Sequence, residues 1–226
     1  RLEQAVRSDA NFLRIGLMDA AAVTVAYHPP VDENGASTIG LDFSDRPFVP
    51  ELKSTRQPML SEVVMGRIGM PEPIVTALVP VLRNEVFAGY VAGVVSTVAI
   101  RSFLDEVVGD SGTLYALLDK NQHVILTNRP GQLAMQPLTR ASGSLERIDD
   151  QLSRWLAQAD ANRAIIERWK QSFYVRSGPV GRLGDWTIVL EQPVAPFQQK
   201  LYQSYAIKLG LLGAILLAAL ALAQWL

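Results

Sequence analysis

The chain has 226 residues, a formal net charge of −1 and 49% hydrophobic residues, so it is long enough for one large domain or two small ones with hydrophobic cores. Its Lys and Arg residues are scattered singly along a near-neutral chain, which excludes the basic stripe typical of nucleic-acid-binding proteins. The absence of Cys excludes a disulfide framework, a thiolate nucleophile and Cys-based zinc sites.

The first segment, residues 1–11, has the pattern of the end of a helix. The chain begins at Arg1 without an initiator Met or a signal peptide, so we expect it to be part of a longer protein. The sequence LRIGLMDAAAVTVAY at 13–27 predicts two strands around a turn near Asp19. The breaker-rich HPPVDENGAS at 28–37 predicts a surface loop.

The next stretch combines short helices with strands. Residues 42–56 are mixed and polar, which predicts one or two short helices. Three apolar runs predict strands, namely PMLSEVVMG at 58–66, PIVTALVPVLR at 73–83 and VFAGYVAGVVSTV at 86–98. An Asn84-Glu85 turn joins the last two of these runs. This part of the chain is therefore expected to be an α+β unit on an antiparallel sheet.

A second unit follows a predicted helix near residues 100–108. The sequence LYALLDKNQHVILTN at 114–128 repeats the strand, polar turn, strand pattern of 13–27, with its turn at 119–122. The runs SFYVRSG at 172–178 and DWTIVLEQP at 185–193 predict a closing hairpin.

Between these strands, the apolar residues of 145–159 recur at spacings of three and four. This periodicity predicts an amphipathic helix that packs on the core. The residues that define its apolar face are Leu145, Ile148, Leu152, Leu156 and Ala159.

The last 18 residues, Leu209 to Leu226, carry no charge and include eight Leu. As a helix they would extend roughly 27 Å, close to the thickness of a hydrocarbon core. Lys208 and Tyr205 precede the run, where snorkelling cations and aromatic rings favour the headgroup layer. We therefore predict a membrane-spanning helix. The alternative is a buried helix of a soluble core, but nothing else in the chain could surround so apolar a cylinder.

Catalytic and metal motifs are weak throughout the sequence. His28 and His123 lie far apart, without a second His at ligand spacing. The neighbouring Asp pairs, such as Asp149 and Asp150, lack the opposed environments that acid/base catalysis needs. No Ser lies in a G-x-S-x-G motif. We therefore expect no catalytic residue, no metal and no cofactor in this chain, and we do not expect it to be an enzyme by itself.

The sequence GLDFSDRPFVPEL at 40–52 resembles the signature of double-Cache sensor domains. VPVLRNEVFAGYVAGVV at 79–95, TLYALLDKNQHVILTN at 113–128 and the apolar helix after the last hairpin extend the resemblance over nearly the whole chain. The resemblance implies an α+β fold with two PAS-like antiparallel-sheet lobes on a long N-terminal helix, followed by a transmembrane helix. The implied ranges are 1–11 for the end of that helix, 12–101 for a membrane-distal ligand lobe, 102–196 for a membrane-proximal lobe and 197–226 for the juxtamembrane and transmembrane helix.

The resemblance also implies a bacterial receptor of the inner membrane, with residues 1–200 on the periplasmic or extracellular side. Such receptors have an upstream transmembrane helix and a cytoplasmic output module, and they work as parallel homodimers. Histidine kinases, diguanylate cyclases and chemoreceptors all carry such sensors. Family frequency favours a histidine kinase in a two-component system.

In similar domains the Asp-x-x-x-Arg-x-aromatic segment contacts a small ligand, and here it corresponds to Asp42, Arg46 and Phe48. A guanidinium can hold a carboxylate with two parallel charge-assisted bonds. Amino-acid-binding members also have an Asp on the last strand for the ammonium group, where this chain has Ser96 and Thr97. The resemblance therefore favours a small carboxylate or other anion over an amino acid.

Secondary ligand contacts are expected from Arg67, Thr76 and Ser96. Three alternatives stay open at this point. Arg46 could instead pair with Asp42 or Asp45 within the fold. The chain could be a periplasmic protein-interaction module with no small ligand, or, less consistent with its missing catalytic groups, a membrane-anchored enzyme.

Overall fold

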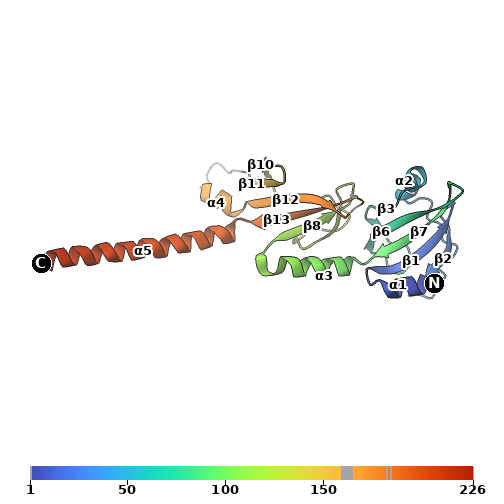
Figure 1. Cartoon of the computed structure of the whole chain (residues 1–226), viewed down its shortest axis with the longest axis horizontal. Helices are drawn as coiled ribbons and strands as arrows, with labels where there is room; N and C mark the ends of the chain where they lie inside the picture. The colour runs from blue at the N-terminus through green and yellow to red at the C-terminus, as the bar shows by residue number, and fades with distance from the viewer. Residues whose placement is uncertain (1, 159–164, 182, 184, 226) are drawn as a thin grey trace. The chain divides into compact units, whose positions relative to one another are not determined.

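The computed structural model describes residues 2–158, 165–181, 183 and 185–225. The chain divides into two compact units. The first unit comprises residues 1–139 and 176–190, and the second comprises residues 140–175 and 191–226. The fold is a mixture of helices and antiparallel strands that ends in an apolar helix, as expected for the α+β class (Figure 1).

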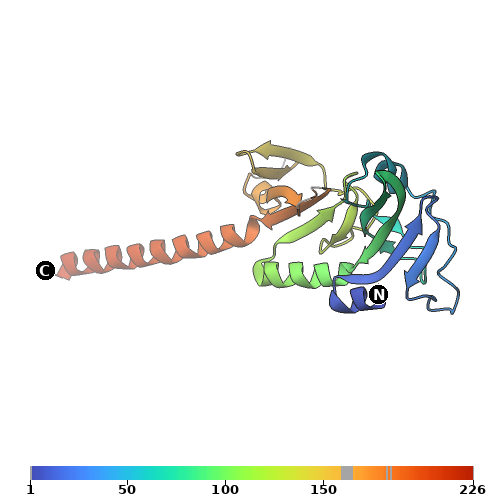
Figure 2. The ribbon, with the colours of Figure 1, turned by 45° about the vertical axis from the view of Figure 1, so that its right-hand side comes forward.

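The N-terminal sheet has the strand order β2-β1-β7-β6-β3. Its strands and the two helices of this region are α1 (Leu2–Ser8), β1 (Phe12–Asp19), β2 (Thr24–His28), α2 (Phe48–Thr55), β3 (Met59–Leu60), β6 (Thr76–Arg83) and β7 (Val86–Val95). The sheet separates α1 from α2, which cover opposite faces (Figure 2). All its strand pairs are antiparallel, and a separate two-stranded ribbon pairs β4 (Val64–Met65) with β5 (Pro73–Ile74).

The hairpin between β6 and β7 turns at the predicted Asn84-Glu85 pair. Asn84 has φ 49° and Glu85 has φ 61°, so both residues adopt the left-handed conformation that a tight two-residue hairpin turn requires. Gly89, further along β7, has φ 146°, and a Cβ there would lie 2.1 Å from the Met18 carbonyl oxygen. Only glycine allows this close approach of β7 to β1.

The core under α2 is aromatic. Phe48, Val49 and Leu52 of α2 are buried against Tyr90 and Met18 of the sheet. Phe48 meets Tyr90 edge to face, with ring centroids 6.5 Å apart and an interplanar angle of 82°. This packing fixes the start of α2, and with it the loop that precedes the helix.

The second sheet has the order β10-β11-β12-β13-β8-β9. The elements of this part of the chain are α3 (Thr97–Val108), the 3-10 turn η1 (Gly109–Ser111), β8 (Leu114–Leu118), β9 (Val124–Thr127), β10 (Gly143–Arg147), β11 (Leu152–Ala157), α4 (Ile165–Lys170), β12 (Phe173–Val180) and β13 (Trp186–Pro193). In the first unit, Tyr115, Leu117, Ile125 and Trp186 form a second hydrophobic core.

The strand-turn-strand patterns around Asp19 and Asp119 fold in the same way. Each carboxylate accepts hydrogen bonds from the backbone N–H groups two and four residues later, at 2.9 Å in all four cases. The residue three positions after each Asp has positive φ, 69° at Ala22 and 64° at Gln122. The repeat noticed in the sequence therefore reflects one turn geometry used twice.

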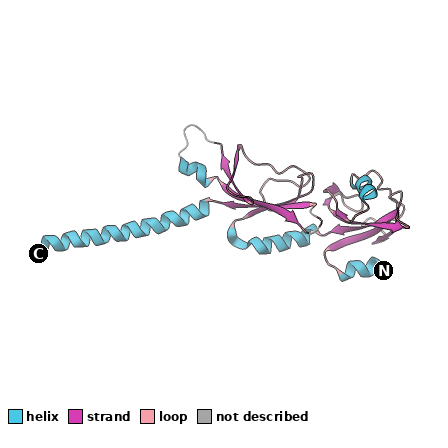
Figure 3. Cartoon of the chain, turned by 45° about the horizontal axis from the view of Figure 1, so that its top comes forward, coloured by secondary structure: helices cyan, strands magenta, loops and turns pink. Residues whose placement is uncertain are grey.

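The predicted helix over 145–159 is wrong. The stretch folds as the antiparallel pair β10 and β11, which Figure 3 colours as strand, and Ala159 lies outside the described residues. The Asp149 carboxylate accepts from the backbone N–H groups of Gln151 and Leu152, at 2.7 and 2.8 Å, and thereby makes a turn in the middle of the supposed helix. The hydrogen bonds from the Asp149 side chain favour a turn here, and they prevail over the helical spacing of the apolar residues.

The C-terminal helix α5 (Ala195–Trp225) confirms the predicted apolar helix; Leu226 lies outside the described residues. Its most apolar 18-residue stretch has a mean hydropathy of 2.3, and none of that stretch is buried. By length and composition this helix could cross a membrane.

Residues 60–65, which we call the bridging segment, connect the N-terminal sheet to the second sheet within the first unit. The Leu60 N–H donates to Asp185 Oδ2 at 2.9 Å, and the Val63 N–H donates to Asp119 Oδ2 at 3.0 Å. The Trp186 indole N–H donates to the Ser61 carbonyl at 3.1 Å. Three hydrogen bonds from residues at or next to the ends of β8 and β13 thus hold the backbone of this segment at Leu60, Ser61 and Val63.

Substitution Asp119→Ala is expected to lower the free energy of unfolding by about 3 kcal/mol, because it leaves three backbone donors without their buried acceptor. The measurement is chemical denaturation of the whole chain in detergent, followed by tryptophan fluorescence. Asp32→Ala is the matched control, since Asp32 makes the same kind of turn at an exposed site. It should cost less than about 1 kcal/mol, and equal losses for both variants would contradict the assignment.

Candidate functional site

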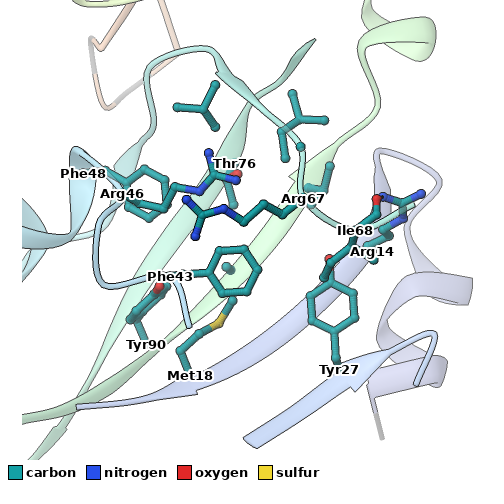
Figure 4. Close-up of a pocket in the computed structure, with 15 residues that line it drawn as sticks. Arg14, Met18, Tyr27, Phe43, Arg46, Phe48, Arg67, Ile68, Thr76 and Tyr90 are labelled. Atoms are coloured by element: carbon teal, nitrogen blue, oxygen red, sulfur yellow. The ribbon is translucent and has the colours of Figure 1, made fainter. Parts of the chain in front are cut away.

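A pocket lies between the N-terminal sheet and the loops on either side of α2, within the first unit. It encloses about 520 Å³ of space free of protein atoms, its opening to solvent included. Most of its lining is apolar, and none of the lining residues is Asp or Glu. The lining residues are Arg14, Met18, Tyr27, Phe43, Arg46, Phe48, Val64, Gly66, Arg67, Ile68, Ile74, Thr76, Tyr90, Ala92 and Val94 (Figure 4).

Arg46 lies at the end of a tight turn, because its backbone N–H donates to the Phe43 carbonyl at 3.0 Å. Its side chain is buried, its guanidinium lies 5.7 Å from the Phe43 ring centroid, and Nη2 donates to the Met65 carbonyl at 2.9 Å. Arg46 makes no ion pair with any carboxylate in the described part of the chain. Burial and the nearby Arg67 charge lower the Arg46 pKa, but an arginine stays charged at neutral pH.

The guanidinium of Arg67 also lies 5.7 Å from the Phe43 ring centroid, but a carboxylate already balances its charge. Its guanidinium donates to Asp45 Oδ1 at 2.8 Å, forms an ion pair with Asp45 Oδ2, and donates to the Asp42 carbonyl at 2.9 Å. The ion pair raises the Arg67 pKa and lowers the Asp45 pKa. The possibility that Arg46 pairs with Asp42 or Asp45 is therefore not realised, because Arg67 takes Asp45.

Arg14, at another wall of the pocket, is matched in the same way. It donates to the Ile68 carbonyl at 2.7 Å and pairs with Glu33 at 2.5 Å. Two of the three pocket arginines thus have a carboxylate partner outside the lining. Arg46 is the one without such a partner among the residues that the structure describes.

Tyr90 contributes an unsatisfied polar group. The residue is fully buried, at 0% exposure, and its hydroxyl has no hydrogen-bond partner in the described structure. Burial raises the pKa of Tyr90 to about 12, so at neutral pH the hydroxyl keeps its proton and can donate it. A buried hydroxyl without a partner is costly, and most buried polar groups in proteins have a hydrogen-bond partner.

Four of the six predicted contact residues line the pocket, namely Arg46, Phe48, Arg67 and Thr76. The other two, Asp42 and Ser96, have turn or cap bonds outside the lining. The Asp42 carboxylate accepts from the Ser44 N–H at 2.8 Å, and the Ser96 hydroxyl caps α3 by accepting from the Ala99 N–H at 3.1 Å. Whether any of the six contacts a ligand stays a prediction.

Sequence reasoning missed Arg14, Phe43 and Tyr90. Tyr90 has the pattern of an ordinary core residue of an apolar strand, and no local signal distinguishes it. Phe43 lies within the segment 40–52 that resembles the sensor signature, but in a polar stretch four residues before a Pro it has the pattern of a loop residue that packs on the core. Arg14 reaches the pocket from β1, which lies between β2 and β7 in the sheet, and this neighbourhood depends on the folded topology.

Substitution Arg46→Met is expected to leave the melting temperature of the ligand-free protein unchanged or higher, because it removes a buried charge that has no counter-ion. The measurement is thermal unfolding of the whole chain in detergent. Arg14→Met is the control: it breaks an existing ion pair and should lower the melting temperature. A loss of about 3–5 kcal/mol for Arg46→Met would instead indicate a structural ion pair.

No protein-family model and no curated protein sequence matches the chain. Several solved structures match it. The Pseudomonas aeruginosa PAO1 amino acid chemoreceptor PctB, whose ligand-binding domain was solved with L-Arg, matches with a TM-score of 0.60 at 18% identity, over 89% of this chain and 75% of that one. The sensor domain of the V. cholerae histidine kinase DctB matches with a TM-score of 0.57 at 16% identity, over 85% of this chain and 76% of that one.

An extracellular ligand binding receptor from Desulfohalobium retbaense matches with a TM-score of 0.56 at 15% identity. The match covers 84% of this chain but only 32% of that receptor, so the chain spans about a third of its length. These identities establish likeness of fold. The chain has the fold of the extracellular sensor domains of histidine kinases and chemoreceptors, which agrees with the resemblance to Cache sensor domains.

Proposed function

We propose that this chain is the extracellular ligand-sensing part of a bacterial transmembrane receptor, and that it binds a small carboxylate or other anion in the pocket around Arg46. The observation that supports the proposal most directly is the state of Arg46 itself. Its guanidinium is buried in an apolar pocket, without a carboxylate partner among the described residues. An anionic ligand would supply the missing counter-charge with two charge-assisted bonds.

The lining also argues for an anion over an amino acid. PctB was solved with the amino acids L-Arg and L-Gln, whose ammonium groups call for a negative partner. Here three arginines and no acid line the pocket. Ser96, at the position where an acid is expected in amino-acid-binding relatives, caps α3 instead.

In the proposed receptor, residues 12–101 form a membrane-distal PAS-like lobe that holds the pocket, and residues 102–196 form the membrane-proximal lobe. Helix α5 anchors the chain in the bacterial inner membrane, with residues 1–200 on the periplasmic side. Two copies associate in parallel. The output module is a histidine kinase, and a diguanylate cyclase or a chemoreceptor would serve the same sensor. The sensing chain itself performs no catalysis.

The signal would leave the pocket through the bridging segment. Its last residue, Met65, supplies the carbonyl that binds Arg46, and three of its other residues bond to Asp119, Asp185 and Trp186. Trp186 is the first residue of β13, which ends at Pro193, two residues before α5 begins. A ligand signals only if its affinity differs between two receptor states, typically by about 1–3 kcal/mol of coupling.

The first test is a thermal-shift screen of the whole chain, in lipid nanodiscs, against small carboxylates and amino acids. A carboxylate present at about 100 times its dissociation constant should stabilise the protein by about 2.7 kcal/mol. Arg46→Met should abolish that shift while leaving the ligand-free melting temperature intact.

If every metabolite leaves the melting temperature unchanged, the proposal of a small-anion sensor is wrong. The alternative of a periplasmic protein-interaction module then becomes the better account. If an amino acid stabilises the protein and its carboxylate analogue without the amine does not, the preference for an anion is wrong.

The second test concerns transmission. Inserting Gly-Gly after Phe197, near the start of α5, should abolish the ligand response of the intact receptor in cells, because it breaks the rigid continuation into the membrane helix. Ligand binding should persist. The same insertion after Gly131, in an exposed loop, is the control and should keep both. A receptor with the Phe197 insertion that still signals normally would rule out this route.

A further inference from the structure

The charges around the pocket allow a narrower statement about the ligand, one that rests on the proposed anion-sensing function. Arg14 is paired with Glu33, and Arg67 is paired with Asp45. Arg46 has no such partner among the described residues, and no acid lies in the lining. The ligand-free pocket therefore holds one uncompensated positive charge.

A bound monoanion would neutralise that charge. A dianion would leave one negative charge in a partly dry and mainly apolar cavity, which is costly unless a second cation becomes free. Among the described residues, the second cation on the Phe43 ring is Arg67, which would have to break its ion pair with Asp45 before it could bind the dianion. Asp45, which lies outside the lining, binds the Arg67 guanidinium with both carboxylate oxygens and would compete with the ligand for it.

The rest of the cavity is built for an apolar body. Met18, Phe48, Ile68, Ile74 and Val94 are among its walls, and most are buried in the sheet or under α2. Apart from the three arginines, the polar side chains of the lining are Thr76, Tyr27 and Tyr90. Such walls favour a short aliphatic chain over a second charged or strongly polar group.

The hydroxyl of Tyr90 supplies a second donor near the charge. It is buried and unsatisfied, and Tyr90 and Arg46 both line the pocket. Figure 4 shows Tyr90, Phe43 and both arginines around one end of the pocket. An oxygen of an anion bound to Arg46 would be the acceptor that this hydroxyl lacks.

We infer that the pocket selects a short aliphatic monocarboxylate, held by the guanidinium of Arg46 and by the hydroxyl of Tyr90, and that the Arg67–Asp45 pair excludes dicarboxylates. Tyr90 is then a specificity-determining residue, although it looks like a core residue in the sequence. Asp45 determines specificity without contacting the ligand, because it keeps Arg67 occupied.

The test is calorimetric titration of the whole chain, in lipid nanodiscs, with two size-matched sets of ligands. The first set is butyrate, succinate and 4-aminobutyrate; the second is hexanoate and adipate. The monocarboxylate of each set should bind at least about tenfold more tightly than its dicarboxylate. Asp45→Asn should release Arg67 and shrink that ratio by about tenfold, chiefly by strengthening dicarboxylate binding.

Tyr90→Phe tests the second donor. It should weaken monocarboxylate binding by about tenfold, because a hydrogen bond to a charged acceptor is lost. Its ligand-free melting temperature should be unchanged or higher, since the substitution removes an unsatisfied buried group. A purely structural tyrosine would show the opposite on both counts. Tyr115→Phe, which removes a buried hydroxyl bonded to Asp105 outside the pocket, is the control and should leave affinity unchanged.

The outcomes separate this inference from the function on which it rests. If dicarboxylates bind as tightly as monocarboxylates or more tightly, the monoanion selectivity is overturned and anion sensing stands. If Tyr90→Phe binds like the wild type, the role of Tyr90 is overturned. If 4-aminobutyrate binds more tightly than butyrate, or if no carboxylate of either set binds, the proposed function fails as well.

Discussion

The burial of Arg46 without a carboxylate partner among the described residues is the constraint around which the pocket of the N-terminal sheet is arranged. A guanidinium taken out of water needs compensation, and among the described residues Arg46 has the carbonyl of Met65 and the face of the Phe43 ring. Two acidic residues lie nearby in the sequence, but both interact with other groups. Asp45 pairs with Arg67, and Asp42 accepts a hydrogen bond from the Ser44 N–H within its own turn. The ligand-free pocket is therefore left electrostatically incomplete.

The pocket and the bridging segment are connected through the hydrogen bond between Arg46 and Met65. The Met65 carbonyl accepts a hydrogen bond from Arg46, so a ligand that displaced the guanidinium would also displace the backbone at the end of the segment. The segment has little freedom to move, because hydrogen bonds join its Leu60, Ser61 and Val63 to Asp185, Trp186 and Asp119. Closely packed, fully bonded elements tend to switch between discrete arrangements rather than deform gradually. In the proposed receptor, a displacement at Arg46 would therefore reach the second sheet through this segment.

The features that could be predicted from sequence are those with local causes. The Asn84-Glu85 turn and the helix α5 follow from neighbouring residues, and both are confirmed. The helix over 145–159 failed because its apolar spacing was coincidental, while the Asp149 turn that breaks it was also local and was undervalued. Tyr90 could not have been found, since its meaning depends on an unpaired hydroxyl, a property of the packed structure alone.

Ser96 bears on the proposed preference for an anion over an amino acid. An acid at this place could meet a ligand's ammonium group only if its side chain faced the pocket. Ser96 instead ends β7 as the N-cap of α3, and its hydroxyl accepts the Ala99 N–H that would otherwise be an unsatisfied donor of the first helical turn. Capping commits the side chain to the helix, and Ser96 does not line the pocket. With that position used for capping, and with Asp45 paired with Arg67, neither residue offers a free negative charge to an amine, which is why the proposed ligand is an anion.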